Sequence, residues 1–278
     1  MIQDLGKKTG PLLLFGGPYS NLHALEAMKV KAEELGIPPT QIICTGDIVG
    51  YCAYPEESIQ FVKKWGIHTI AGNVEFNLMD EAESCGCNFE EGSRCDSFSK
   101  QWFPFAKTKV SLDALKYLET IPEFIRFDFN GKKVFVLHGS YENTSEFIFK
   151  STPASLKASD FILANADMII AGHSGLPFVD QVILNEKTKT WLNPGVIGMP
   201  ANDGTPDVWY VILENEKINF HRLTFDYKKA SEAMSEHPLP TAYAETLQTG
   251  LWDNCDILPA KETAEMGKRI EEKIIKLN

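Results

Sequence analysis

Three short apolar runs, each ending at a glycine beside a polar or turn-forming residue, most restrict the fold of this chain. The runs are residues 11–15, 41–44 and 68–71, and residues 20–35 and 56–65 between them place apolar side chains three or four positions apart. The short runs are typical of buried strands and the wider spacing of amphipathic helices. Strand, helix, strand, helix, strand in that order predicts a parallel sheet with crossover helices.

The second half of the chain is more typical of antiparallel strands. Residues 125–129 alternate apolar and charged side chains, and Asn130-Gly131 connects them to the apolar run 134–137, which predicts a hairpin. Further strand patterns occupy residues 169–171, 208–213 and 218–223.

Two stretches show no regular pattern. They are residues 80–107, which hold three cysteines, and the proline- and glycine-rich residues 193–206. Residues 262–277 have the spacing of a final amphipathic helix. We therefore expect a single α/β domain over residues 1–278, with a cysteine-containing insertion at about 80–107 and a helical C-terminal tail at about 228–278.

Composition narrows the function classes. The 278 residues include 27 Lys+Arg and 38 Asp+Glu, a net charge of −11, and no basic run, so a nucleic acid polymer or an anionic membrane is an unfavourable partner. No signal-peptide pattern and no membrane-length apolar segment occur. Six cysteines are too few for a secreted disulfide scaffold, and we expect reduced thiols and a cytoplasmic location. Oligomeric state is open.

Four polar residues stand where apolar runs stop. Asp47 follows Gly46, Asn73 follows Gly72, His138 precedes Gly139, and His173 follows Gly172. Ligands of open α/β sheets bind at the carboxyl ends of strands. One carboxylate, one amide oxygen and two imidazoles suit a borderline divalent metal such as Mn, Fe, Co or Zn. Each residue alone is more typical of a cap or turn than of a ligand, but four in register favour a metal site.

These motifs resemble the calcineurin-like metallophosphoesterase family over residues 12–223. Thr45-Gly46-Asp47, Gly72-Asn73, Leu137-His138-Gly139 and Gly172-His173-Ser174 follow the family's order, and Asn193-Pro194-Gly195 is similar to the YfcE-type bacterial branch. The resemblance implies a four-layer α/β/β/α sandwich of two mixed sheets and a two-metal site that hydrolyses phosphate esters. It also implies that Asp47, Asn73, His138 and His173 hold the second metal, with Asp47, Asn73 and His138 as catalytic residues.

The family's first metal site is degenerate in this chain. Its opening Asp-x-His falls on Gly17-Pro18-Tyr19, and the last histidine of its Gly-His-x-His falls on Gly175. The histidine after the asparagine, which the family uses near the leaving group, is Val74, and an arginine often found near Pro200 appears as Ala201. One ion cannot clamp both the attacking and the leaving oxygen. We therefore expect one metal and weakened, altered or absent phosphoesterase chemistry.

Three further residues are candidates for substrate binding: Tyr19, Asn21 and Asn202. Tyr19 stands at a histidine position and either binds a ferric ion or packs over a vacated site. The glycine-rich turn that ends at Asn21 precedes a helix, where backbone amides can hold a phosphate. Asn202-Asp203-Gly204 is a turn signature that lies near the cleft in the resembling family.

Four cysteines form a separate hypothesis. Cys85, Cys87 and Cys95 lie in the insertion after Asn73, and Cys52 follows the Asp47 turn. Together they would suit an additional thiolate-bound metal or a redox cluster. The Cys-x-Cys spacing is not a strong metal motif, and ordinary buried or surface thiols are the alternative.

Three functions follow. The first is a metal-dependent hydrolase of a small phosphate mono- or diester. The second is a catalytically weakened or inactive scaffold that binds a phosphorylated ligand or partner. The third is a cysteine-linked metal or redox protein.

Overall fold

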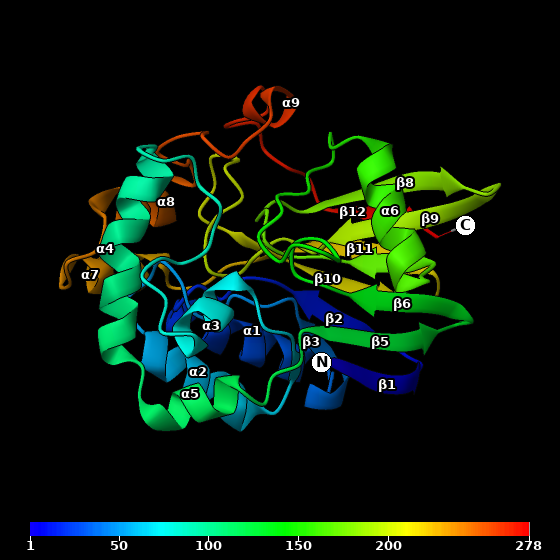
Figure 1. Ribbon diagram of the computed structural model, residues 1–278, viewed down its shortest axis with the longest axis horizontal. Coiled ribbons are helices and arrows are strands. Elements are labelled where there is room, and N and C mark those ends of the chain that lie inside the picture. Colours follow the sequence, from blue (N-terminus) through cyan, green and yellow to red (C-terminus); the bar gives the residue numbers. More distant parts are fainter. Residues whose placement is uncertain (278) are drawn as a thin grey trace.

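The computed structural model describes residues 1–277 and contains two six-stranded sheets packed face to face (Figure 1). The first sheet has the order β1-β5-β6-β7-β9-β8 and mixes parallel and antiparallel pairs. Its strands are β1 (Ile2–Lys8), β5 (Phe124–Phe129), β6 (Lys132–Val136), β7 (Met168–Ile170), β8 (Phe178–Leu184) and β9 (Lys187–Asn193).

The second sheet has the order β12-β11-β10-β2-β3-β4. Its strands are β2 (Leu12–Phe15), β3 (Ile42–Cys44), β4 (His68–Thr69), β10 (Val208–Glu214), β11 (Lys217–Leu223) and β12 (Lys273–Lys276). Strands β2, β3 and β4 pair in parallel, as the three apolar runs predicted. The predicted β5–β6 hairpin is also confirmed, and the strands expected at 208–213 and 218–223 form the antiparallel pair β10–β11.

Helices cover the outer face of each sheet. Helix α6 (Ala154–Ala164) packs on the first sheet, where its Phe161 meets Trp191. The other helices with buried faces gather on the second sheet, as Figure 1 shows for α1 and α2 below it and for α4, α7 and α8 at the left. The remaining bounds are α1 (Leu22–Glu34), α2 (Pro55–Trp65), α3 (Asn73–Met79), α4 (Arg94–Lys109), α5 (Leu112–Leu118), α7 (Tyr227–Ser235), α8 (Thr241–Thr249), α9 (Ala260–Thr263) and the 3-10 turn Pro39–Gln41.

Strand β2 shows why the layers form. Its four apolar side chains are all fully buried, because both faces of the strand are covered. Leu12 and Leu14 point into the core between the sheets, while Leu13 and Phe15 point into the core beneath the helices. Because successive side chains of a strand point to opposite faces, β2 contributes to two separate cores. The four-layer α/β/β/α sandwich is the fold that the resemblance implied.

Two expectations about irregular and helical segments were wrong. Residues 94–107 of the stretch expected to be irregular belong to α4, whose buried side chains Phe98, Trp102 and Phe105 lie on one face. Pro104 within the helix obscured the pattern. The tail is helical only in part. In place of a helix over residues 262–277, α9 ends at Thr263 and β12 joins the edge of the second sheet by pairing with β11. Strand pairing outweighs the local helical spacing there.

No helix within residues 1–277 is long and apolar enough to span a bilayer.

Candidate metal centre

The four candidate ligands sit at strand ends of both sheets. Asp47 follows β3, and Asn73 opens α3 soon after β4, in one sheet; His138 and His173 follow β6 and β7 in the other. All four side chains are buried, with exposed fractions between 2% and 7%. Asp47 and His173 adopt positive φ angles of 54° and 57°, which sharp turns at these strand ends impose. The sheets therefore meet at one point where both contribute ligands.

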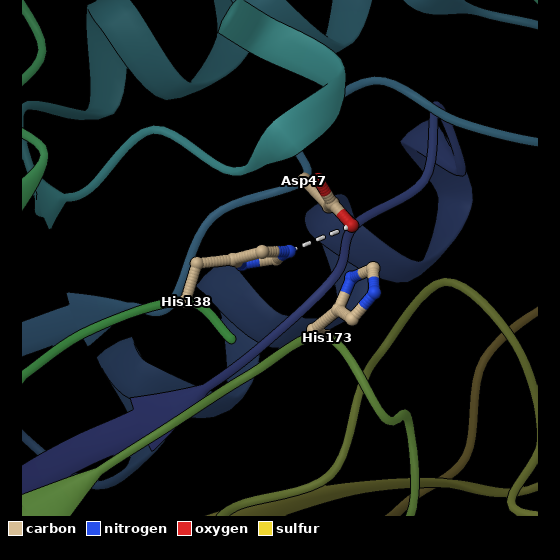
Figure 2. A group of neighbouring side chains, drawn as sticks. All are labelled: Asp47, His138 and His173. Atoms are coloured by element: carbon tan, nitrogen blue, oxygen red, sulfur yellow. Dashed lines mark ion pairs between the residues drawn. The ribbon is translucent and has the colours of Figure 1, made fainter. Parts of the chain in front are cut away.

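Three of the four ligands converge closely (Figure 2). One ligand atom from each of Asp47, His138 and His173 lies within 4.8 Å of the others. His138 Nε2 is 3.1 Å from Asp47 Oδ2, yet the pair lacks the alignment of a hydrogen bond. A carboxylate oxygen and an unprotonated imidazole nitrogen at this distance are placed to share a cation.

The surroundings of His138 fix which nitrogen is available. Its Nδ1 lies 2.6 Å from the carbonyl oxygen of Thr45, so the proton resides on Nδ1 and the Nε2 lone pair faces Asp47. Burial lowers the pKa of His138, but the Asp47 carboxylate and the Thr45 carbonyl outweigh burial, and the pKa is raised. A nearby carboxylate and an oriented ring are the usual setting of a metal-binding histidine.

His173 has more apolar surroundings than His138. Its ring stacks on Phe147 with 4.2 Å between centroids. Burial, followed by the neighbouring His138, lowers its pKa to about 3. Neither ring nitrogen has a hydrogen-bond partner within residues 1–277. A histidine that stays neutral offers an unprotonated ring nitrogen to a metal ion, because no proton competes for that nitrogen.

Asn73 is the fourth candidate ligand, through its side-chain oxygen. Its Nδ2 donates to the carbonyl oxygen of Cys85 at 2.9 Å, which turns Oδ1 the other way. Oδ1 is buried and accepts no hydrogen bond from any residue in the range 1–277. A buried carbonyl oxygen without a donor costs free energy unless a ligand satisfies it. The donors present therefore fit a divalent ion of the borderline class.

Glu75 is a site residue that the sequence reasoning missed. Its buried carboxylate accepts from the backbone N–H groups of Asp47, Val49 and Gly72 at 2.8–3.1 Å. Desolvation and then the Asp47 charge raise its pKa to about 7. Glu75 thereby ties the turn that carries Asp47 to the turn before Asn73. Its place three residues after Gly72, at the start of a helix, is the capping-box spacing that could have revealed it.

Aromatic rings occupy the surroundings of the missing first-site ligands. A Cβ at Gly17 would lie 2.5 Å from the Tyr19 ring, so that ring covers the glycine. At Gly175 the nearest neighbour is the indole of Trp252, 3.6 Å from where a Cβ would lie. Burial and then the Asp47 charge raise the pKa of Tyr19 well above its usual value, which favours the neutral phenol. Packing over a vacated position, the alternative considered for Tyr19, agrees with this geometry.

A small cavity opens beside His173. Its free volume is about 80 Å³, and Tyr19, Tyr51, Phe147, Tyr243 and Trp252 contribute to its wall. Within residues 1–277 no lysine or arginine lines it, and Asp253, the one acidic residue in its wall, is paired with Arg94. The cavity is therefore an aromatic chamber without positive charge.

The two candidate asparagines lie elsewhere. Asn21 caps α1 by accepting from the Ala24 N–H at 3.2 Å, and its Nδ2 donates to the Gly198 carbonyl at 3.0 Å, so both amide atoms are engaged. Asn21 is thus a helix cap, and its assignment to substrate binding stays a prediction. Asn202 is not part of the cavity wall; its Oδ1 accepts from the Trp252 N–H at 2.8 Å.

The four cysteines do not form a cluster. Within residues 1–277 the grouping of three or more potential metal ligands is the Asp47 set, and no thiol belongs to it. Cys52 Sγ faces the carbonyl of Gly198, whereas Cys95 Sγ faces Asn254. Burial raises the pKa of Cys95 to about 12 and that of Cys87 well above its usual value, which disfavours thiolates. The thiolate-cluster expectation is therefore wrong, because the insertion folds Cys95 into α4, against the C-terminal segment.

Comparison with known proteins now decides the family. The profile of the calcineurin-like phosphoesterase superfamily domain matches residues 17–217. The chain belongs to this superfamily. It is 28% identical over 247 residues to the uncharacterised protein MJ0912 of Methanocaldococcus jannaschii, a match that covers 84% of this chain and 95% of that protein.

Two solved structures share the fold. A metallophosphoesterase from Sphaerobacter thermophilus superposes with a TM-score of 0.67 at 24% identity, covering 88% of this chain and all of the other. The hypothetical protein PH1004 from Pyrococcus horikoshii gives a TM-score of 0.70 at 18% identity, over 91% of this chain and all of the other. At these identities the likeness establishes the superfamily fold alone.

Proposed function

We propose that this member of the calcineurin-like phosphoesterase superfamily is a metal-dependent hydrolase of a phosphate mono- or diester that works through a single divalent ion. The observation that carries the proposal is the convergence of Asp47, His138 and His173 within 4.8 Å, and the buried, unpaired oxygen of Asn73 supports it. The Tyr19 ring over Gly17, together with the missing ligand side chain at Gly175, supports one ion rather than two.

The role of each site residue follows from the chemistry of its side chain. A divalent ion held by Asp47, Asn73, His138 and His173 would supply Lewis acidity toward a phosphoryl oxygen and toward water. Glu75 holds the Asp47 and Gly72 turns in place through their backbone amides. Tyr19 keeps its proton and lines the adjoining cavity, so its phenol is available as a hydrogen-bond donor to a phosphate oxygen.

The cavity wall favours a particular kind of ester. Aromatic side chains and the absence of lysine and arginine from its wall, among residues 1–277, suit an uncharged, compact aromatic or apolar alcohol portion. The same wall gives no compensation to a polyphosphate chain. We therefore propose a small aryl- or alkyl-phosphate ester as substrate rather than a polyphosphate or a nucleic acid polymer.

Metal analysis combined with turnover tests this function. We expect purified protein loaded with Mn²⁺, Fe²⁺, Co²⁺ or Zn²⁺ to retain one equivalent and to hydrolyse phenyl phosphate or diphenyl phosphate. His173→Ala removes a ligand and is expected to lose the ion and to reduce kcat/KM roughly 100-fold or more. His221→Ala, a histidine in β11 that stacks on Tyr210 outside the site, is the matched control. Absence of bound metal together with absence of turnover would overturn the proposal.

A binding role without catalysis is the second candidate, and Tyr19 and Trp252 over the vacated positions favour it. It predicts that the protein retains metal and binds phenyl phosphate in a metal-dependent manner, with no turnover. Calorimetry of the metal-loaded protein separates the two functions, because a hydrolase releases phosphate during the titration and a binding scaffold does not.

A further inference from the structure

A second, larger groove lies between the C-terminal segment and the body of the protein. Its volume is about 690 Å³, within the range that suits a ligand of drug-like size. In Figure 1 this segment descends from α9 to β12, drawn in red. Buried apolar side chains from separate parts of the chain contribute to the wall, among them Phe149, Phe178 and Leu258.

The rim of the groove is positively charged although the protein is acidic. Five basic side chains and two acidic ones line it, a local balance of +3 in a chain whose net charge is −11. They are Lys150, Lys261, Lys268, Arg269 and Lys273, with Glu262 and Glu265. Lys268 pairs with Glu265 at 2.9 Å, and Arg269 lies 3.8 Å from Glu271. Within residues 1–277, no carboxylate lies within the 4.0 Å ion-pair distance of Lys150, Lys261 or Lys273.

Lys150 and Lys273 line the same groove from different parts of the chain. Lys150 follows Phe149 in the loop before α6, and Lys273 begins β12. Burial lowers the pKa of Lys273, and the charge of Lys150 lowers it further. Two like charges so placed repel each other, and an anion between them would relieve the repulsion.

Asn202 adds a buried donor to the groove wall. The side chain is 4% exposed, and its Oδ1 accepts from the Trp252 N–H, which fixes the orientation of the amide. Its Nδ2 has no acceptor within residues 1–277. A buried amide donor without an acceptor costs free energy until a partner accepts from it. Asn202, predicted to contact substrate, therefore lines this groove and not the aromatic cavity.

We propose that this groove binds one anionic amphiphile, whose carboxylate or phosphate group lies near Lys150, Lys273 and the Asn202 amide while its apolar portion covers Phe149, Phe178 and Leu258. Charge complementarity selects the head group, and the apolar wall selects the remainder of the ligand. The groove shares no residue with the metal centre, so this proposal stands independently of the phosphoesterase function.

Calorimetric titration of the full chain tests the proposal with four probes below their micellar concentrations. Decanoate and decyl phosphate carry the two head groups, decyltrimethylammonium reverses the charge, and acetate lacks the chain. We expect saturable binding of one decanoate or decyl phosphate per chain, and the tighter of the two identifies the head-group source. The cationic probe and acetate are expected to bind at least about tenfold more weakly.

Paired variants locate the binding. Lys150→Gln combined with Lys273→Gln is expected to weaken decanoate at least about tenfold. Lys64→Gln combined with Lys116→Gln removes the same charge from exposed positions outside the groove and serves as the matched control. Lys261→Glu reverses one positive charge in the groove lining and so gives a second test of decanoate binding. The position is exposed, so this change leaves the core intact. Equal binding of the acetate and decanoate probes, equal binding of the cationic probe, or identical losses in the variant and control pairs would each overturn the proposal.

Discussion

Two buried carboxylates, Glu75 and Asp160, are held by backbone amides instead of by counter-charges. Glu75 accepts three backbone N–H groups, and Asp160 of α6 accepts the Tyr141 N–H at 3.0 Å. Such bonds favour the charged form, but desolvation outweighs them, and the pKa values rise to about 7 for Glu75 and about 6 for Asp160. Each residue therefore stabilises the fold less as it ionises.

Asp160→Asn tests this at a position away from the metal ligands. The pKa of Asp160 is raised from 3.8 to about 6, so its protonated form is favoured in the folded state and its contribution is lost as pH rises from about 4 to about 6. The variant is expected to be more stable than the wild type at pH 7, by at most about 3 kcal/mol, and to show little difference at pH 4. Urea unfolding at both pH values measures this. Asp113→Asn is the control, because Lys63 lowers the pKa of Asp113 and the slope should reverse.

Gly17→Asp tests whether the Tyr19 ring excludes the missing ligand. The new Cβ would lie 2.5 Å from the ring, and overpacking of this kind costs roughly 1–3 kcal/mol. Gly17→Asp with Tyr19→His is expected to recover stability, and adding Gly175→His is expected to raise bound Mn²⁺ from one equivalent to two. Thermal unfolding and metal analysis provide the measurements. If Gly17→Asp alone were as stable as the wild type, the placement of the Tyr19 ring over Gly17 would be contradicted.

At the scale of elements, Arg222 of β11 attaches the C-terminal segment. Its guanidinium pairs with buried Asp203 and donates to the carbonyl of Ile270, while Asp203 accepts the Ile270 N–H at 3.1 Å. Arg222→Met leaves Asp203 as an uncompensated buried charge, which costs about 3–5 kcal/mol. We expect hydrogen exchange to accelerate over residues 268–277, with unchanged rates in β5 and β6. Arg269→Met, at an exposed arginine, is the control, and equal exchange in both variants would refute this attachment.

The sequence predicts elements well where burial dictates the pattern. Strands β2 and β3 are fully buried apolar runs, and Asn21 gives the start of α1. Strand β1 was missed because it is largely exposed, so its sequence carries no apolar face. The candidate metal ligands could be predicted from the sequence because each follows the end of a strand. The position of Trp252 beside Gly175 could not, because it arises from a contact between distant segments and leaves no local signal in the sequence. Pairing of β12 with β11 was hidden for the same reason.

At the scale of the whole molecule, the candidate metal centre lies where the two sheets meet. Asp47 and Asn73 come from strand ends of one sheet and His138 and His173 from the other, so an ion bound to all four would crosslink the layers. An ion that binds only the folded state at 100 times its Kd stabilises that state by about 2.7 kcal/mol. In a chain of this size, we expect Mn²⁺ or Zn²⁺ at that level to raise Tm by roughly 5–10 °C.

Scanning calorimetry with and without a chelator measures this coupling. His173→Ala removes the ligand from one sheet and is expected to abolish the metal-dependent rise in Tm, whereas His221→Ala should retain it. Because the ligands belong to two sheets, loss of metal should also increase hydrogen exchange in β3 and β7 together. A rise in Tm that survives in His173→Ala would mean that the ion binds elsewhere and does not link the sheets through these side chains.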